Sequence, residues 1–483
     1  MQAVFETINS WVWSPALVWL CLGAGLYFSI RTRFMQVRGI AEMLRLLFGG
    51  RRSDAGVSSF QALAMSLSGR VGVGNIAGVA TAIAFGGPGA VLWMWVVAFL
   101  GASTAYVEST LAQIYKEKDE RQQYRGGPAY YIEKAMGQRW YGWLFALVTV
   151  LATGFLLPGV QANAIASSLD TAWGIPRLAT AAGLLLALGF IIIGGVRRIA
   201  SFAQVVVPFM ALGYIVVAVI VVALNAGELP RVLELIVSSA FGAEAAFGAI
   251  TGLAVEWGVK RGVYSNEAGQ GTGPHAAAAA EVAHPAQQGY VQAFSVYVDT
   301  LLVCSATAFM VLITGNYNVY APDNQPLVEH LPGVEEGPGF AQHAVESVIP
   351  GFGSIFVALA LLFFAFTTIV AYYYMAETNV SYMNRHVRNR WFTAALRLLV
   401  LVAVGYGTLR TASAAWTLGD IGVGLMAWFN LIAILILQKP ALLALRDYER
   451  QKREGGALRF DPEGLGIRNA DLWSERMRRG RLD

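Results

Sequence analysis

Eleven apolar stretches, each close to the length that spans a bilayer, set the first constraint on how this chain folds. A helix needs about 20 apolar residues to cross a hydrocarbon core. Only 14% of the 483 residues are charged and 56% are hydrophobic, whereas soluble domains carry about 25% charged residues. We therefore predict an all-α integral membrane protein with about 11 transmembrane helices. The predicted spans are 11–30, 58–83, 88–115, 141–167, 178–196, 203–225, 237–258, 288–315, 352–378, 391–409 and 414–437.

The basic residues between these spans predict how the chain is oriented. Alternate loops hold 19 Lys and Arg, whereas the loops on the other side hold only Arg177, Arg231 and Arg410. Because cytoplasmic loops are enriched in Lys and Arg, the N-terminus is predicted outside and the C-terminal tail inside. The basic loops are 31–57, 116–140, 197–202, 259–287 and 379–390.

The net charge of +4 thus describes loops beside a membrane rather than a nucleic-acid groove. No obligate protein partner is indicated. Cys21 and Cys304 lie in apolar stretches and support neither a disulfide framework nor a thiolate metal site.

Two of the predicted spans are poor membrane helices. The second contains Gly69, Gly72, Gly74 and Gly78, and the seventh, 237–258, is similarly rich in glycine. Glycine-rich backbone is tolerated at membrane depth where it lines a cavity. Close helix packing is the alternative explanation for such glycines.

The positions of the two weak helices favour a binding site. If the first span is set aside, ten remain as two sets of five, and each set opens with a weak helix. Such paired breaks are the best sequence indication of a secondary transporter's site, and an odd-numbered repeat inverts its second copy. The predicted units are an extra N-terminal helix and loop (1–57), a first repeat (58–225), an inverted second repeat (226–437) and a cytoplasmic tail (438–483).

Four segments carry a resemblance to a known family. They read GVGNIAGVATAIAFGGPGAVLWMWV at 72–96, GVQANAIA at 159–166, KRGVYSNEAGQGTGPHAAAA at 260–279 and FAFTTIVAYYYMAE at 364–377. In order and spacing they resemble the alanine or glycine:cation symporter family along nearly the whole chain. The resemblance implies the leucine-transporter fold, a 5+5 inverted repeat. It also implies sodium-coupled symport of alanine or glycine by alternating access across a bacterial inner membrane, with sodium as coupling ion and no organic cofactor.

The resemblance also assigns candidate ligands for sodium. The carbonyls of Ser68 and Val71 would face the ion, opposite the hydroxyls of Thr367 and Thr368 and the carbonyl of Phe364. Oxygen ligands suit a hard cation. Back-bonding of the two threonines to their own helix is the alternative.

The amino acid would lie against the Gly69–Gly74 backbone and a second break at Phe247–Gly252, with its carboxylate on backbone N–H groups and its ammonium on carbonyls. Gln161 would contact it, although a helix–helix hydrogen bond is the alternative for Gln161 and Asn163. Tyr372 would be a gate, a pocket wall or a packing residue. The full set of substrate candidates is Gly69, Arg70, Val73, Gly74, Gln161, Asn163, Phe247, Gly248, Thr251, Gly252 and Tyr372. The candidate break or hinge residues are Gly72, Asn75, Gly78, Asn266, Glu267 and Gly269.

Arg70 departs from the small or hydroxyl residue that the resemblance implies at this position in many family members. An arginine at membrane depth needs a partner or water. It could neutralise Glu108, Glu244 or Asp299, bind the substrate carboxylate, or put a fixed charge where a second sodium ion would bind. We favour the last two roles together.

Other function classes fit less well. An enzyme would need a nucleophile with a base or a metal cluster, and the five histidines show no ligand spacing. A channel usually builds its pore from symmetric subunits. The glycines at 269, 271 and 273 lack the strand and the Lys-Ser/Thr ending of a phosphate-binding loop. A proton-coupled carrier of the same fold is the nearest rival.

Overall fold

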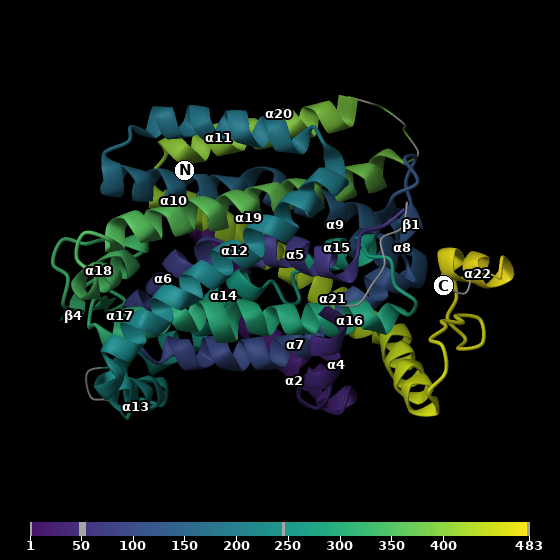
Figure 1. Cartoon of the computed structure of the whole chain (residues 1–483), viewed down its shortest axis with the longest axis horizontal. Coiled ribbons are helices and arrows are strands. Elements are labelled where there is room, and N and C mark those ends of the chain that lie inside the picture. The colour runs from purple at the N-terminus through teal and green to yellow at the C-terminus, as the bar shows by residue number, and fades with distance from the viewer. Residues whose placement is uncertain are drawn as a thin grey trace.

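The computed structural model describes residues 2–47, 55–243, 247–385, 387, 389 and 391–480. Figure 1 shows a bundle of helices that run mostly along the long axis of the molecule, with the two chain termini toward opposite ends. Helices account for nearly all of the regular structure, which confirms the predicted all-α membrane class. Glu244, a predicted partner of Arg70, lies outside the described residues.

The first half of the chain forms twelve α-helices and one hairpin in the described ranges. The hairpin pairs β1 with β2 antiparallel. The elements are α1 (Gln2–Val12), α2 (Pro15–Arg31), α3 (Met35–Arg38), α4 (Ile40–Leu47), α5 (Ser59–Arg70), α6 (Val79–Gly86), α7 (Ala90–Ile114), β1 (Glu117–Lys118), β2 (Tyr124–Arg125), α8 (Pro128–Met136), α9 (Arg139–Leu151), α10 (Leu157–Trp173), α11 (Arg177–Ile192) and α12 (Gly195–Leu224).

The second half adds ten α-helices and a second antiparallel hairpin, β3 with β4. π-helical segments at Ala152–Leu156 and Tyr297–Cys304 join α9 to α10 and α16 to α17. The elements are α13 (Leu229–Ala240), α14 (Thr251–Asn266), α15 (Gly273–Ala279), α16 (Pro285–Val296), α17 (Ser305–Ile313), β3 (Asn318–Tyr320), β4 (Pro326–Glu329), α18 (Pro338–Val348), α19 (Gly353–Asn384), α20 (Trp391–Leu409), α21 (Ala412–Glu454) and α22 (Asp471–Arg478).

Eight helices in the described part of the chain are long and apolar enough to cross a membrane. Their outer faces are apolar: Phe209, Leu212 and Val219 of α12 are each at least 60% exposed. An exposed apolar face of this kind suits lipid rather than water. The eight spans are Ala3–Arg31, Ala90–Ile114, Arg139–Trp173, Gly195–Leu224, Pro285–Ile313, Gly353–Asn384, Trp391–Leu409 and Ala414–Glu454.

The first glycine-rich span is interrupted where the sequence predicts it. Helix α5 begins at a capping box formed by Ser58 and Gln61, and it ends at Arg70. Val71 is extended, with φ −75° and ψ 87°, and a π-helical turn, Gly74–Gly78, leads into α6. The freed N–H of Gly72 donates to Oδ1 of Asn75 at 2.8 Å, so the interruption carries its own cap.

The segment that follows the second glycine-rich span differs from the sequence prediction in two respects: the position of the buried break and the burial of the predicted loop. The predicted span 237–258 is interrupted, since α13 ends at Ala240 and α14 begins at Thr251, but Gly248 and Gly252 are exposed there. A buried break, which the sequence predicted only as a hinge in a loop, follows α14 at 267–272. Glu267, Gly269 and Gly271 all have positive φ, and α15 resumes the helix at Gly273. Residues 258–280 are buried throughout, so 259–287 is not the predicted cytoplasmic loop.

Buried charges explain why the sequence misled at this loop. The sequence pattern counts Lys260 and Arg261 among the cytoplasmic basic residues, because charged residues usually mark loops. In the structure both pair with Asp420 of α21, at 2.9 and 2.7 Å. A charge that is paired can remain buried in a protein. The excess of Lys and Arg in the alternate loops persists when these two residues are left out.

The C-terminal segment folds back onto the helices. Trp473 of α22 is 3% exposed and donates its indole N–H to the carbonyl of Gln113 at 2.8 Å. Arg476 pairs with Glu281, and Lys134 of α8 pairs with Asp471 at 2.9 Å. Figure 1 shows α22 at the same end of the molecule as α8. This tail therefore covers the ends of α7 and α8.

Candidate functional site

Three oxygens from α5 and α19 meet at the first break. The hydroxyl Oγ1 of Thr368 lies 2.9 Å from the carbonyl oxygen of Ser68 and 2.9 Å from that of Phe364. All three residues are buried. One hydroxyl hydrogen cannot satisfy both carbonyls at once, so the cluster has more acceptor than donor capacity. Such a cluster can accept a small cation.

The other two predicted sodium ligands lie nearby but are less well placed. Both Thr367 and Thr368 bond the carbonyl of Phe364 in their own helix at 2.9 Å, which is the back-bonding alternative. Among the described residues, only Thr368 also reaches Ser68 of α5. The hydroxyl of Thr367 also lies 3.8 Å from the sulfur of Met210. Val71 is buried, and its N–H donates to the carbonyl of Leu67 at 2.7 Å. The structure thus groups Ser68, Phe364 and Thr368 most tightly.

Gln161 of α10 reaches the first break from another side. Its Oε1 accepts the N–H of Val73 at 3.1 Å. A Cβ at Gly72 would lie 2.5 Å from Oγ1 of Thr368 and 3.1 Å from Oε1 of Gln161. Only glycine therefore lets α5, α10 and α19 approach this closely. At Gly74 a Cβ would press on Ser265 at 3.2 Å.

Asp299 ties the first break to α14. The sequence indicated it as a possible partner of Arg70 and as an acid available to a proton-coupled carrier. Its Oδ1 accepts from Nδ2 of Asn75 at 2.7 Å and from the hydroxyl of Ser265 at 3.1 Å. Thr300 donates to its other oxygen at 2.7 Å. The signal available in the sequence was an acid inside an apolar span.

Arg70 is 1% exposed and faces acidic residues from three elements. Its Nη1 donates to the carbonyl of Gln292 at 3.1 Å and to the hydroxyl of Ser295. Glu267, Glu108 and Asp299 lie within electrostatic range of its guanidinium. Two of the predicted partners, Glu108 and Asp299, are therefore close to it.

Glu108 of α7 caps the second break. Its carboxylate accepts the N–H groups of Gly269 and Gly271 at 3.3 and 3.2 Å. Nδ2 of Asn430 donates to it at 2.7 Å. Asn266, a predicted hinge residue, accepts the N–H of Ala268 at 3.0 Å. The backbone groups freed by the break thus have partners inside the protein.

Several sequence-predicted residues lie away from this cluster. Asn163 donates to the carbonyls of Gly407 and Arg410, which is the helix–helix alternative. Gly248 and Gly252 are exposed near the start of α14. Phe247 is buried and Thr251 bonds the carbonyl of Gly248. Gly78 of the π-helical turn meets only ordinary contacts, at 3.9 Å and beyond.

Tyr372 of α19 lies close to the acidic residues of the two breaks. It is 3% exposed, and Glu267 and Asp299 are within its electrostatic range. Gly69 faces the carboxylate of Glu267 directly, because a Cβ at Gly69 would lie 3.3 and 3.4 Å from its two oxygens. The structure thus brings Gly69, Arg70, Glu267 and Tyr372 into one buried region.

The comparisons with known proteins decide the family. The model of the sodium:alanine symporter family matches residues 1–462. The chain belongs to this family.

Two relatives of this symporter family match nearly end to end. A putative sodium/proton-dependent alanine carrier of Bacillus subtilis is 61% identical over 98% of both chains. A sodium/proton-dependent alanine carrier of Bacillus sp. strain PS3 is 54% identical over 90% of this chain and 98% of its own. A variant of the Eremococcus coleocola manganese transporter has a TM-score of 0.52 at 15% identity, covering 86% of this chain and 84% of that one. At that identity the likeness concerns the fold alone.

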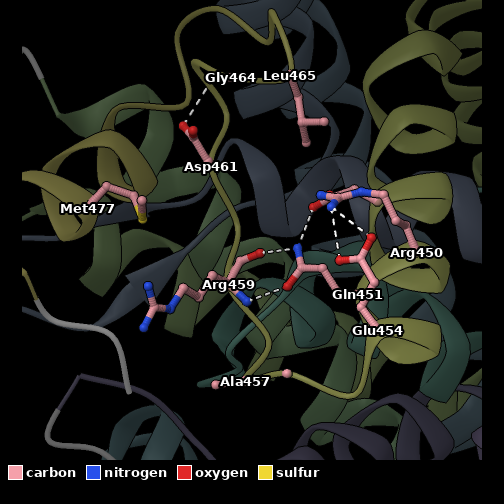
Figure 2. Close-up of a pocket in the computed structure, with 11 residues that line it drawn as sticks. Arg450, Gln451, Glu454, Ala457, Arg459, Asp461, Gly464, Leu465 and Met477 are labelled. Carbon is pink, nitrogen blue, oxygen red and sulfur yellow. Dashed lines mark hydrogen bonds and ion pairs between the residues drawn. The ribbon is translucent and has the colours of Figure 1, made fainter.

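A separate cavity is lined by the end of α21 and the C-terminal tail. Figure 2 shows it between the end of α21 and the tail, where the charged groups largely pair with one another. Arg450 pairs with Asp447 at 2.6 Å and with Glu454 at 3.1 Å. None of the sequence-predicted site residues lines it. In this member of the symporter family, the candidate site is therefore the buried region around the breaks at 71–78 and 267–272, and not this cavity.

Proposed function

We propose that this chain couples the inward movement of sodium to the uptake of alanine or glycine. The observation that carries the proposal is the convergence of the Ser68 carbonyl, the Phe364 carbonyl and the Thr368 hydroxyl at 2.9 Å. Val71 and Thr367 complete the proposed sodium site. These oxygens come from two separate helices, so an ion between them would hold the helices together.

The amino acid is proposed to lie between the two breaks. The backbone of Gly69, Val73 and Gly74 borders it, with Gln161 and Tyr372 as side-chain contacts. Small residues leave room only for a small side chain on the substrate. Arg70, with Nε and Nη2 free of hydrogen bonds among the described residues, is the proposed partner of the carboxylate.

The proposed mechanism is alternating access in a bacterial inner membrane, with the N-terminus outside and the tail inside. Residues 58–225 and 226–437 are the proposed inverted repeats, and their relative rocking opens the site to each side in turn. Sodium binds first and orders α5 against α19. The ion gradient then supplies the work of accumulation.

The test is uptake of labelled alanine and glycine into proteoliposomes with an inward sodium gradient and, separately, a proton gradient. Accumulation driven by sodium supports the proposal. The alternative is proton-coupled uptake by the same fold, because two relatives are described as sodium/proton-dependent alanine carriers. Uptake driven by a proton gradient alone would contradict the assignment of the Ser68, Phe364 and Thr368 oxygens to sodium. Absence of alanine and glycine uptake by folded protein would refute the substrate class.

A further inference from the structure

The carboxylate of Glu267 is buried without a partner ion or a well-formed hydrogen bond among the described residues. The residue is 1% exposed, and neither Oε1 nor Oε2 makes a hydrogen bond of normal geometry in this part of the chain. The hydroxyl of Thr272 is a neutral donor close enough to the carboxylate to favour its charged form. A buried charged group without hydrogen bonds or a partner ion is strongly unfavourable. Glu267 is therefore built to meet a group that this structure does not contain.

The other two acids of the same region are already satisfied. Glu108 accepts from the N–H groups of Gly269 and Gly271 and from Asn430. Asp299 accepts from Asn75, Ser265 and Thr300. Three donors account for most of the acceptor capacity of a carboxylate that faces protein. Of the three, Glu267 has the fewest donors within the described ranges, with the Thr272 hydroxyl beside it and no hydrogen bond of normal geometry.

Arg70 does not supply the missing partner. Its Nη1 is directed to the carbonyl of Gln292 and the hydroxyl of Ser295. No ion pair within 4.0 Å joins it to Glu267 in the part of the chain that the structure describes. The titratable groups that face Glu267 from neighbouring elements are Arg70, Glu108, Asp299, Tyr264 and Tyr372. Three acids with one arginine leave this region short of positive charge.

The position of Glu267 defines the kind of cation it would meet. Its two oxygens lie against Gly69, the residue of the first break that has no side chain, beside the methyl group of Met375. Glu267 itself opens the second break, in the left-handed conformation at φ 58°. This carboxylate thus lies between the two interruptions that border the proposed substrate site.

We propose that Glu267 binds the ammonium group of the amino-acid substrate. This inference rests on the proposed function, and it names a side chain where backbone carbonyls alone were expected. The ligand class is a small zwitterionic α-amino acid, whose three ammonium hydrogens can reach both oxygens of Glu267 and a carbonyl of the first break. A charge-assisted hydrogen bond in a buried site is a strong one.

The first test compares alanine with lactate, which replaces the ammonium by a hydroxyl. In proteoliposomes, wild-type protein is expected to bind alanine far more tightly than lactate. Glu267→Gln should raise the alanine KM by about tenfold or more and narrow the difference between the two ligands. The sodium concentration for half-maximal uptake should change much less. Glu267→Asp should recover part of the alanine affinity.

Glu108→Gln is the matched control, because Glu108 is equally buried and also within range of Arg70. It should lower the stability of the protein without selectively weakening alanine relative to lactate. Gly69→Ala is a second variant that removes no charge. Its Cβ would lie 3.3–3.4 Å from the oxygens of Glu267, so it should also weaken alanine binding. Alanine-dependent stabilisation against heat in detergent provides a readout that needs no transport.

An unchanged alanine KM in Glu267→Gln would overturn the inference. The inference would also fail if Glu267→Gln removed the pH dependence of uptake but left the alanine affinity unchanged, because Glu267 would then carry a proton rather than bind the ammonium group. If wild-type protein binds another amino acid but not alanine or glycine, the proposed substrate fails and the same comparison with that amino acid's hydroxy analogue decides the role of Glu267. A wild type stabilised by no amino acid overturns both.

Discussion

The hydroxyl of Thr368 lies 2.9 Å from the carbonyl oxygen of Ser68, although the two residues are 300 positions apart in the chain. The contact joins the middle of α19 to the last turn of α5, immediately before the first break. It is the point at which the two proposed halves of the ion site touch.

Thr368→Val is expected to raise the sodium concentration needed for half-maximal alanine uptake by about tenfold or more, because it removes an oxygen ligand while keeping the shape. Thr149→Val is the control, since that buried hydroxyl bonds only the carbonyl of Phe145 in its own helix. Equal effects of the two substitutions on sodium dependence would remove Thr368 from the site.

Gly72→Ala is expected to abolish uptake. Its Cβ would lie 2.5 Å from Oγ1 of Thr368, so α5 and α19 could not keep their present separation. Gly78→Ala should be tolerated, because its Cβ would make only contacts of 3.9–4.0 Å. Labelled alanine uptake, corrected for the amount of folded protein, measures both. Full activity of Gly72→Ala would show that the close approach is dispensable.

Asp299→Asn is expected to destabilise the protein by about 1–3 kcal/mol, since an amide N–H₂ would face one of the donors that now serve the carboxylate. Those donors are Asn75, Ser265 and Thr300. Thermal unfolding in detergent measures the change, and Asp323→Asn in the exposed β3–β4 turn is the control. A melting temperature unchanged by Asp299→Asn would contradict this role.

Trp473→Ala is expected to release the C-terminal tail. The substitution removes the indole that is buried against the end of α7 and donates to Gln113. Limited proteolysis should then cut after α21 faster than in wild type, whereas Trp19→Ala, on an exposed face of α2, should leave the rate unchanged. Because the family match ends at residue 462, transport itself need not depend on α22.

The apolar stretches predicted the helices well, because length and composition are properties of single segments. The first break was also predicted, since Gly69, Gly72 and Gly74 weaken a helix wherever they lie. The second glycine-rich stretch also interrupts the helices, between α13 and α14, but it is not the buried break at 267–272. Glycines at 248 and 252 resembled the first break, but they lie exposed near the start of α14.

The buried break at 267–272 could not be recognised as buried from the sequence because of the charged residues beside it. Lys260, Arg261 and Glu267 made the segment resemble a loop in water. Only tertiary structure shows that Asp420 pairs the two cations inside the protein and that Glu108 holds the turn at Gly269 and Gly271. Partners that come from more than 150 positions away leave no local signal in the sequence.

The contact between Ser68 and Thr368 also bears on the order of assembly during synthesis. Chains emerge from the ribosome N-terminus first, and helices can insert as they appear. The carbonyl of Ser68 therefore enters the membrane before its contact residue Thr368, which is available only after α19 has been synthesised. The ion site is completed late in biogenesis, so a chain interrupted before α19 would hold half of a site with nothing opposite it.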